Sequence, residues 1–223
     1  MRKPFLVLVL IAAACGGSSS STGTPPTPLG GRINGHAFTP AAARAMVVGS
    51  GATPCSIGPG VSVGFKALVV EAATYPGVCG DLTAIPLCTR HPSSQTVTVL
   101  IAKVNQTAPY TEPALTTGTY LASADLAMVA AGEGWAQTLD VGLDPTTWTT
   151  STGVTGTIRI DAIPLSSTAP VTGHVALSFG GADTVAGDFS ADYCTTGIPD
   201  ACTMAQTIAA AIGGSGAAGI CTP

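Results

Sequence analysis

The sequence predicts an all-β domain, an antiparallel β-sandwich of about eight to ten strands, stapled by disulfide bonds and ending in a short C-terminal helix. Three observations lead to this expectation. Apolar and polar residues alternate with a period of two over much of the chain, as in strands with one buried face. Residues 203–212 change to a helical spacing. The chain has seven cysteines but only 9% charged residues, a composition typical of a β-rich exported protein.

The first residues have the three-part layout of a secretory signal. Arg2 and Lys3 form a positive region, residues 5–11 are an apolar run, and small residues then precede Cys15. The apolar run is shorter than the roughly 20 residues that a membrane-spanning helix needs. The stretch Leu10-Ile11-Ala12-Ala13-Ala14-Cys15 resembles a bacterial lipobox. We therefore expect residues 1–14 to be a lipoprotein signal peptide.

This resemblance implies that Cys15 becomes the lipidated first residue of the mature protein, with a diacylglyceryl group and an N-acyl chain such as palmitate. One acyl chain binds membranes only marginally, whereas two or more anchor a protein stably. Gly16 follows the cysteine in place of an aspartate, which in the known sorting pattern implies the outer membrane. The expected location is the cell envelope, with the membrane as a partner through the lipid anchor. In the other interpretation the protein is simply secreted and Cys15 is incidental.

The charge of the mature chain argues against nucleic acid as a partner. Loss of Arg2 and Lys3 leaves six basic and twelve acidic residues, a net charge of −6, whereas phosphate binding needs clustered Lys and Arg. Residues 15–31 comprise the lipidated cysteine and a Gly/Ser/Thr/Pro tether without apolar periodicity. We expect residues 32–223 to form a single domain.

The six cysteines besides Cys15 suggest three disulfide bonds in an exported protein. They are Cys55, Cys79, Cys88, Cys194, Cys202 and Cys221. The short loop favours a bond between Cys79 and Cys88. Cys194 is then expected to pair with Cys202 or Cys221, and Cys55 with the one left over. A zinc site is disfavoured because no Cys-x-x-Cys pair occurs, and no metal or cofactor is predicted.

The first half of the domain contains strands separated by Gly- and Pro-rich turns. Residues 31–38 and 42–48 are expected to form a first strand pair. Residues 96–104 have the composition of a strand buried on both faces. The other predicted segments are strands at 61–72, 118–121 and 135–141, a loop at 73–94 and a short helix within 123–131.

The last strands, at 157–162, 174–179 and 184–193, alternate most clearly and predict a meander. The apolar rows of the strands at 174–179 and 184–193 both face the core only if Leu177 pairs with Val185. This pairing requires a three-residue loop, Gly180-Gly181-Ala182. This register sets His174 opposite Asp188. The same reasoning pairs Ile160 with Val175 and sets Asp161 beside His174. The helix predicted at 203–212 follows, with Met204, Ile208 and Ile212 at a spacing of four and Gly213 as a stop.

Asp161, His174 and Asp188 could form a polar row across three strands, as a weak metal site or an acid/base group. We favour a cross-strand ion pair on a solvated face, because no nucleophile or third metal ligand lies nearby in the sequence. No catalytic residue is predicted.

Other candidate groups have simpler structural interpretations. Trp135, Trp148, Tyr110 and Tyr120 could form a sugar-stacking platform, but the chain has few aromatic residues and its core needs them. The loop carboxylates Asp140, Asp144 and Asp200 could bind calcium, but their spacing is irregular and turn positions explain them. Neither a His-Glu-x-x-His motif nor a Walker loop occurs. His36 and His91 lie near Gly or Pro in predicted turns, although catalytic triads need not be local in sequence.

Three segments resemble uncharacterised bacterial lipoproteins that share an exported strand-rich domain: residues 31–38, 173–179 and 185–194. These are packing motifs, so the resemblance implies no activity. The leading expectation is a non-enzymatic envelope or cell-surface lipoprotein that is structural or binds an unknown protein or glycan. One alternative is a carbohydrate-binding module, with Trp135 and Trp148 on one exposed face. The other is a hydrolase, with Ser or Asp reaching His36, His91 or His174 in a cleft.

Overall fold

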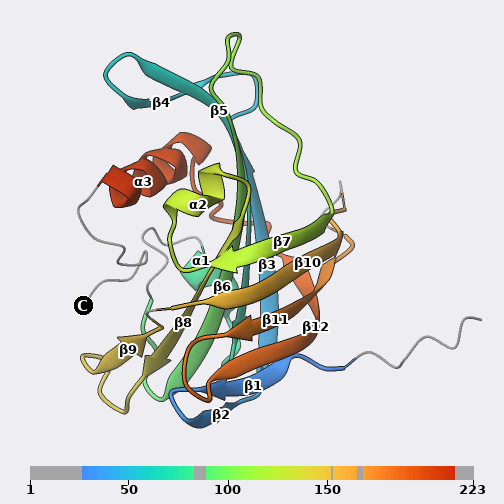
Figure 1. Cartoon of the computed structure of the whole chain (residues 1–223), viewed down its shortest axis with the longest axis vertical. Coiled ribbons are helices and arrows are strands. Elements are labelled where there is room, and N and C mark those ends of the chain that lie inside the picture. Colours follow the sequence, from blue (N-terminus) through green and yellow to red (C-terminus); the bar gives the residue numbers. More distant parts are fainter. Residues whose placement is uncertain (1–26, 83–88, 152, 165–167, 214–223) are drawn as a thin grey trace, which may run out of the picture.

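The computed structural model of the chain describes residues 27–82, 89–151, 153–164 and 168–213. Most of this part of the chain is β-strand (Figure 1). The strands are β1 (Gly30–Ile33), β2 (His36–Phe38), β3 (Ala42–Gly49), β4 (Cys55–Gly58), β5 (Val61–Ala73), β6 (Ser94–Asn105), β7 (Gly118–Ser123), β8 (Gly134–Val141), β9 (Trp148–Thr150), β10 (Thr155–Ala162), β11 (Val171–Ser178) and β12 (Thr184–Tyr193). The helices are α1 (Val78–Leu82), α2 (Ala127–Ala130) and α3 (Ala201–Gly213).

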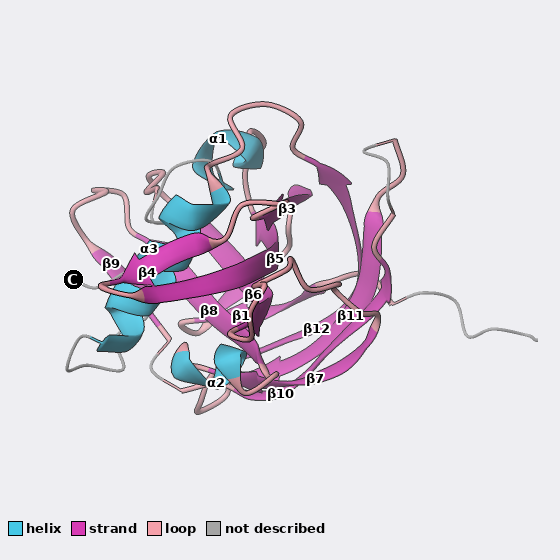
Figure 2. Cartoon of the chain, turned by 90° about the horizontal axis from the view of Figure 1, so that it is seen from above, coloured by secondary structure: helices cyan, strands magenta, loops and turns pink. Residues whose placement is uncertain are grey.

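Eight strands close into a barrel, so the predicted β-sandwich is wrong. Their order is β11-β10-β7-β8-β6-β5-β3-β12, and β11 pairs in turn with β12 (Figures 1 and 2). Two antiparallel groups, β7-β10-β11-β12 and β3-β5-β6-β8, are joined at both edges by short parallel pairings, β12 with β3 and β7 with β8. A sandwich leaves these edges unpaired, whereas here both carry backbone hydrogen bonds. The strand alternation is the same in both architectures.

The remaining strands extend the barrel at its edges. β1 pairs with β12 and β2, β4 with β5, and β9 with β8. The predicted pairing of residues 31–38 with 42–48 is wrong, because residues 30–38 fold into the β1–β2 hairpin and β3 pairs with β5. The hairpin turns at Asn34-Gly35, where both residues have positive φ, 50° and 76°. Asn-Gly is the residue pair that favours such a two-residue turn.

Two apolar clusters share the wall formed by β3, β5, β6 and β8. The inner cluster fills the barrel and includes Leu68, Val99, Ile158 and Phe189. The outer cluster lies between this wall and the three helices, which Figures 1 and 2 place on the same side of the barrel. Strand β6 is buried on both faces from residue 94 to residue 102, which confirms the prediction for residues 96–104 except at Lys103, which is half-buried, and Val104, which is exposed.

Two disulfide bonds attach the helices to the sheet. Cys55 on β4 bonds Cys202 on α3, and Cys79 on α1 bonds Cys194, which follows β12. The Cys55–Cys202 bond is one of the two pairings left open for Cys55. The predicted Cys79–Cys88 bond and the pairing of Cys194 with Cys202 or Cys221 are wrong, because the fold brings together cysteines far apart in sequence.

Several predictions concern residues outside the described ranges. These are the signal peptide, Cys15, the tether up to residue 26, Cys88 and Cys221. Residues 27–29 already belong to the fold, since Asp188 N–H donates to Thr27 O at 2.7 Å and Leu29 N–H to Asp188 O at 3.2 Å. Within the described part of the chain, no helix has the length and apolar character required to cross a membrane.

The C-terminal elements follow the predicted pattern. Leu177 pairs with Val185 and His174 with Asp188, and Gly180 and Gly181 take positive φ in the expected three-residue loop. The register predicted for the preceding strand is wrong. Ile158, not Ile160, pairs with Val175. Both isoleucines are buried, so the apolar pattern does not distinguish two registers that differ by two residues. The predicted C-terminal helix is confirmed, and it begins at Ala201.

Candidate functional site

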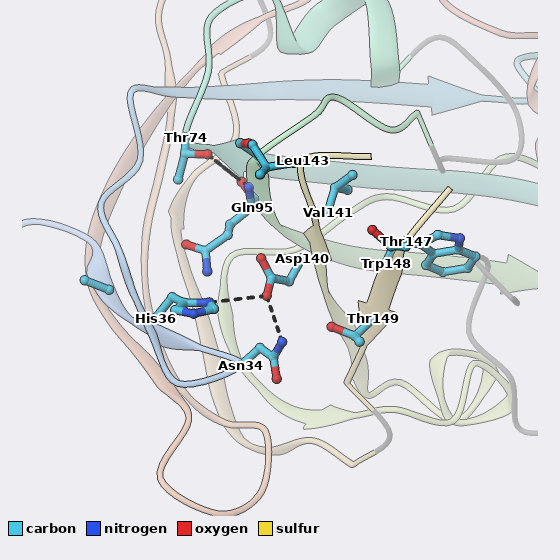
Figure 3. A pocket seen from close by; sticks show the side chains of 13 residues that line it. Asn34, His36, Thr74, Gln95, Asp140, Val141, Leu143, Thr147, Trp148 and Thr149 are labelled. Carbon is cyan, nitrogen blue, oxygen red and sulfur yellow. Dashed lines mark hydrogen bonds and ion pairs between the residues drawn. The ribbon is translucent and has the colours of Figure 1, made fainter. Parts of the chain in front are cut away.

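A pocket of about 570 Å³ opens at one end of the barrel, between the β1–β2 hairpin, the β8–β9 hairpin and the start of β6. Its polar lining includes Asn34, His36, Gln95, Asp140 and Thr149 (Figure 3). The two hairpins lie at the same end of the barrel in Figure 1. This pocket is the candidate functional site because it combines a cavity with convergent polar side chains.

The strand register brings three of these side chains to one face. Asp140 on β8 lies opposite Gln95 on β6 and opposite Thr149 on β9. Gln95 and Asp140 continue the rows to which the inner residues Val97 and Ala136 belong, because alternate residues of a strand face the same side. They therefore close the apolar interior with polar groups at the mouth of the barrel.

The turn that presents Asn34 is held by a carboxylate from the far end of the chain. Asp183, in the β11–β12 loop, accepts hydrogen bonds from the backbone N–H groups of Asn34 at 2.8 Å and Gly35 at 2.9 Å. Gln95 Nε2 donates to the carbonyl of Ile33 at 3.1 Å. The hairpin is thus fixed from both sides, and the Asn34 side chain points into the pocket (Figure 3).

Asp140 is the recessed charge of the pocket. Its side chain is 15% exposed, and Oδ2 accepts a hydrogen bond from Asn34 Nδ2 at 2.9 Å. The His36 imidazole, largely exposed, approaches the same oxygen through Nδ1 at 3.6 Å. Neither lysine nor arginine is among the residues that line the pocket. Asp140 was expected to be a solvated turn residue or a calcium ligand, whereas it is a strand residue at the base of a cavity.

Trp148 lies on the opposite face of the β8–β9 hairpin from Asp140. It pairs with Val141, and Figure 3 shows its ring pointing away from the carboxylate. The Arg90 guanidinium lies 4.0 Å over its ring centre. Trp135 is buried in the outer cluster, where its Nε1 donates to the Ala124 carbonyl at 3.0 Å. The two tryptophans therefore do not form the shared exposed platform that the carbohydrate-binding alternative requires.

Comparison with known proteins gives no match, whether with protein-family models, with curated proteins or with solved structures. The candidate site is therefore assessed from its own geometry.

The polar row on the outer face of β10–β12 is an ion-paired network. His174 Nδ1 lies 2.8 Å from Asp188 Oδ1. Arg159, not Asp161, lies opposite His174, and it pairs with Asp161 along the same strand, Nε to Oδ1 at 2.8 Å. The hydrogen bond from His174 lowers the pKa of Asp188, and a further bond from the backbone N–H of Thr27 acts in the same direction. Each carboxylate in this row already has a partner.

A second polar cluster, partly buried, lies between α1 and the outer face of β5 and β6. Tyr75 OH donates to Asp81 Oδ2 at 2.6 Å, and His91 Nε2 lies 3.0 Å from the same oxygen. Glu71 is 4% exposed and accepts a hydrogen bond from Thr98 Oγ1 at 3.1 Å. Burial raises the pKa of Glu71 to about 8, so this carboxyl is mostly protonated at neutral pH. The pKa of Tyr75 is raised mainly by burial and, to a smaller extent, by its hydrogen bond to Asp81.

The three histidines have aspartate neighbours but no activated nucleophile. No hydrogen bond joins a histidine ring to a serine, threonine or cysteine side chain within the described ranges. One hydrolase-like pattern occurs, Gly60-Val61-Ser62-Val63-Gly64. Its serine pairs with Ser56 in the β4–β5 hairpin, whereas a nucleophile elbow is a turn from a strand into a helix. This pattern is therefore part of a hairpin strand.

The other loop aspartates have structural roles. Asp144 Oδ1 accepts from the backbone N–H of Thr146 at 2.9 Å. Asp200 caps α3, because its Oδ1 accepts from the N–H groups of Cys202 and Thr203, both at 3.0 Å. Among the described residues, no group of three or more His, Cys, Asp or Glu side chains is placed to hold a metal ion.

Sequence reasoning missed three of the polar residues named for the pocket, Asn34, Gln95 and Thr149. Asn34 carried a signal, since the dipeptide Asn34-Gly35 marks a tight hairpin turn. Gln95 carried none, because a glutamine at the start of an apolar strand has no distinctive pattern. Asp140 and His36 were considered separately, and only the folded barrel brings them together.

Proposed function

We propose that this protein is an exported, lipid-anchored lipoprotein of the cell envelope whose barrel binds a small polar ligand at its mouth without catalysis. The anchor rests on Cys15 and the signal that precedes it. The Cys55–Cys202 and Cys79–Cys194 bonds support export, because disulfides persist mainly in oxidising compartments.

The observation that carries the binding function is the recessed Asp140 carboxylate in an open pocket. Burying a charged group is unfavourable unless it is compensated. Here the compensation in the free protein consists of one amide hydrogen bond from Asn34 and a more distant imidazole. Such a site gains from a ligand that completes the hydrogen bonding.

The non-enzymatic part of the proposal rests on the lack of an activated nucleophile beside His36. Asp140 could orient the imidazole, but nucleophilic catalysis also needs a side-chain hydroxyl or thiol within hydrogen-bond reach of that imidazole. Ser93 lines the same pocket, where its backbone N–H donates to the carbonyl of Gly142, and no hydrogen bond joins it to His36 among the described residues. The proposal is therefore a binding protein and not a hydrolase.

The anchor is tested in a bacterial host that expresses the full chain. We expect an alkyne-labelled palmitate to be incorporated into the wild-type protein and to be lost in Cys15→Ala. Cell fractionation should then move the variant from the membrane to the soluble fraction. Equal labelling of both proteins would contradict lipidation at Cys15.

The binding function is tested by ligand-observed NMR with a mixed library of small polar molecules. Thr149→Trp fills the pocket, whereas Thr184→Trp places the same side chain on an exposed position of β12 as a matched control. We expect ligands that bind the wild type and Thr184→Trp to be lost in Thr149→Trp. Ligands that bind all three proteins equally would place the site elsewhere.

A further inference from the structure

The pocket has an unbalanced charge. Three carboxylates in ion pairs have a lysine or arginine in contact: Glu112 has Lys66 at 2.7 Å, Asp192 has Arg44 at 2.9 Å and Asp161 has Arg159 at 2.8 Å. The Asp140 side chain is less exposed than each of these, at 15% against 22%, 68% and 46%. It makes no ion pair with lysine or arginine within the described part of the chain.

Two arginines of the neighbouring segments have other partners. Arg32 donates from Nη2 to the carbonyl of Gly35 within the hairpin, and the Arg90 guanidinium lies over the ring of Trp148, which lines the pocket. A second cavity, of about 470 Å³, shows the contrasting case: its lining includes Lys66, whose charge is neutralised by Glu112. Of these two cavities, only the mouth pocket presents a carboxylate, and that carboxylate has no lysine or arginine partner among the described residues.

The polar groups around Asp140 also favour a hydrogen-bond donor as ligand. Gln95 uses its Nε2 to bind Ile33, so its Oε1 remains as an acceptor on a side chain that is only 8% exposed. Asp140 supplies carboxylate oxygens, and Thr149 adds a hydroxyl on the same face. Acceptors and a negative charge at the base of a cavity complement a group with several N–H donors and a positive charge.

The far side of the pocket is apolar. Val141 and Leu143 line it, and the Leu143 side chain is 88% exposed. An exposed leucine beside a charged cavity can cover an alkyl chain while the charged end of the ligand reaches the base. The pocket therefore has a polar base and an apolar rim.

We propose that the mouth pocket binds a small molecule with a primary ammonium group, whose nitrogen contacts Asp140 and whose alkyl part lies against Leu143. This inference rests on the binding function proposed above and names the chemical class of its ligand. It excludes anions, which Asp140 repels.

The test is protein-observed NMR on the folded wild-type domain at low salt and neutral pH. The probes are n-butylammonium, the neutral n-pentanol, methyl α-glucoside and calcium chloride. We expect n-butylammonium to shift the side-chain amide signals of Asn34 and Gln95, and the affinity to fall as salt is added because the contact is ionic. The two neutral probes should bind at least tenfold more weakly.

Two isosteric variants distinguish the effect of the Asp140 charge on n-butylammonium binding from the effect of the overall charge of the protein. Asp140→Asn should weaken n-butylammonium binding at least tenfold, since its amide oxygen can still accept from Asn34 but the charge is gone. Asp161→Asn removes one equal charge from the outer face of β10 and should leave the affinity unchanged. Thermal unfolding of Asp140→Asn near the wild-type temperature would show that the barrel is intact.

Three results would overturn the ammonium assignment. These are equal binding of n-butylammonium to Asp140→Asn, binding of n-pentanol or methyl α-glucoside as tight as that of the amine, and binding of calcium in preference to it. Glucoside binding that Thr149→Trp abolishes would retain the proposed binding function and reject only the ligand class. If none of the four probes and no library molecule binds the pocket, both proposals fail.

Discussion

Glu71 shows how one buried residue makes stability depend on pH. Its carboxyl ionises near pH 4.5 when unfolded and near pH 8 in the folded chain, mainly because burial disfavours the charge. Between these values the folded chain binds more protons than the unfolded chain, so stability falls as pH rises. The contribution is complete below pH 4.5 and is lost as pH rises through 8. Hydrogen bonds from Thr98 and Tyr75 to the Glu71 carboxylate lower its pKa and so partly oppose the effect of burial, whereas repulsion by Asp81 raises the pKa further.

Glu71→Gln should remove this pH dependence. The amide has nearly the same shape and stays neutral, so we expect the variant to be more stable than the wild type at pH 9, by about 1–3 kcal/mol, with the difference shrinking toward pH 4. Urea unfolding across this range measures it. Glu133→Gln, at a half-buried site after α2, is the matched control and should follow the wild type. Parallel pH profiles for wild type and Glu71→Gln would contradict the role of Glu71.

Asp183 is the residue on which the shape of the candidate site depends. Both of its oxygens bind backbone N–H groups of the β1–β2 turn. Asp183→Ala should therefore destabilise the domain by about 1–2 kcal/mol and increase amide exchange at Asn34 and Gly35. Asp183→Asn keeps one acceptor and should show a smaller effect. Unchanged exchange at both amides would show that the turn holds without Asp183.

The residues of the site illustrate what a single sequence can predict. The pairing of His174 with Asp188 followed from strand parity, because both strands have one apolar row that must stay inside. The contact of Asn34 with Asp140 joins residues 106 positions apart. No local pattern encodes such a contact, since it depends on how the barrel closes.

At the scale of elements, α3 depends on a covalent attachment. Cys202 lies in its first turn and bonds Cys55, which is fully buried on β4, across a sequence separation of 147. Replacing both cysteines by alanine should cost about 2–4 kcal/mol of unfolding free energy. Limited proteolysis should then cut at α3 before the barrel. If α3 resists proteolysis as in the wild type, the packing of Met204 and Ile208 alone holds the helix.

Gly64 on β5 lies against the connection between β6 and β7. A Cβ atom there would come within 2.1 Å of the carbonyl oxygen of Thr111. Because a backbone atom is in the way, Gly64→Ala should displace this connection and destabilise the domain by about 1–3 kcal/mol. Chemical denaturation measures the loss. Gly58→Ala, where a Cβ meets nothing within 4 Å, is the control and should be neutral.

The elements with strong local patterns were predicted and those without were not. Strict alternation located β11 and β12, and the helical spacing located α3. Residues 31–38 were taken as one strand, although the pair Asn34-Gly35 favours a two-residue hairpin turn. The disulfide partners could not be deduced, because 115 residues separate Cys79 from Cys194 and only the folded barrel brings them together.

At the scale of the whole molecule, the barrel consists of two antiparallel groups of strands joined by two short parallel seams. β5 and β6 share ten paired positions, whereas β12 with β3 and β7 with β8 share two each. Both architectures, sandwich and barrel, have one apolar row per strand. Alternation therefore predicts the strands but does not show whether the outer strands of the two groups pair with each other.

Hydrogen exchange should reveal this organisation. We expect amides in the β5–β6 ladder to exchange most slowly and those at the β12–β3 seam, residues 192–194, to exchange earlier, because short edges open at lower cost than long ladders. Mass spectrometry of peptides from the two regions measures the difference. Equal protection of both regions would show that the barrel opens only as a unit.

The β12–β3 seam also constrains when the barrel can form. Asp192 and Tyr193 must pair with Arg44 and Ala45, near the other end of the domain. A polypeptide that emerges N-terminus first, from a ribosome or a translocation channel, exposes one edge of β3 until almost the whole domain has followed. An unpaired strand edge invites misassociation during that interval. Chain order alone thus makes closure a late step of biogenesis, and it makes an incompletely delivered chain vulnerable to chaperone binding and proteolysis.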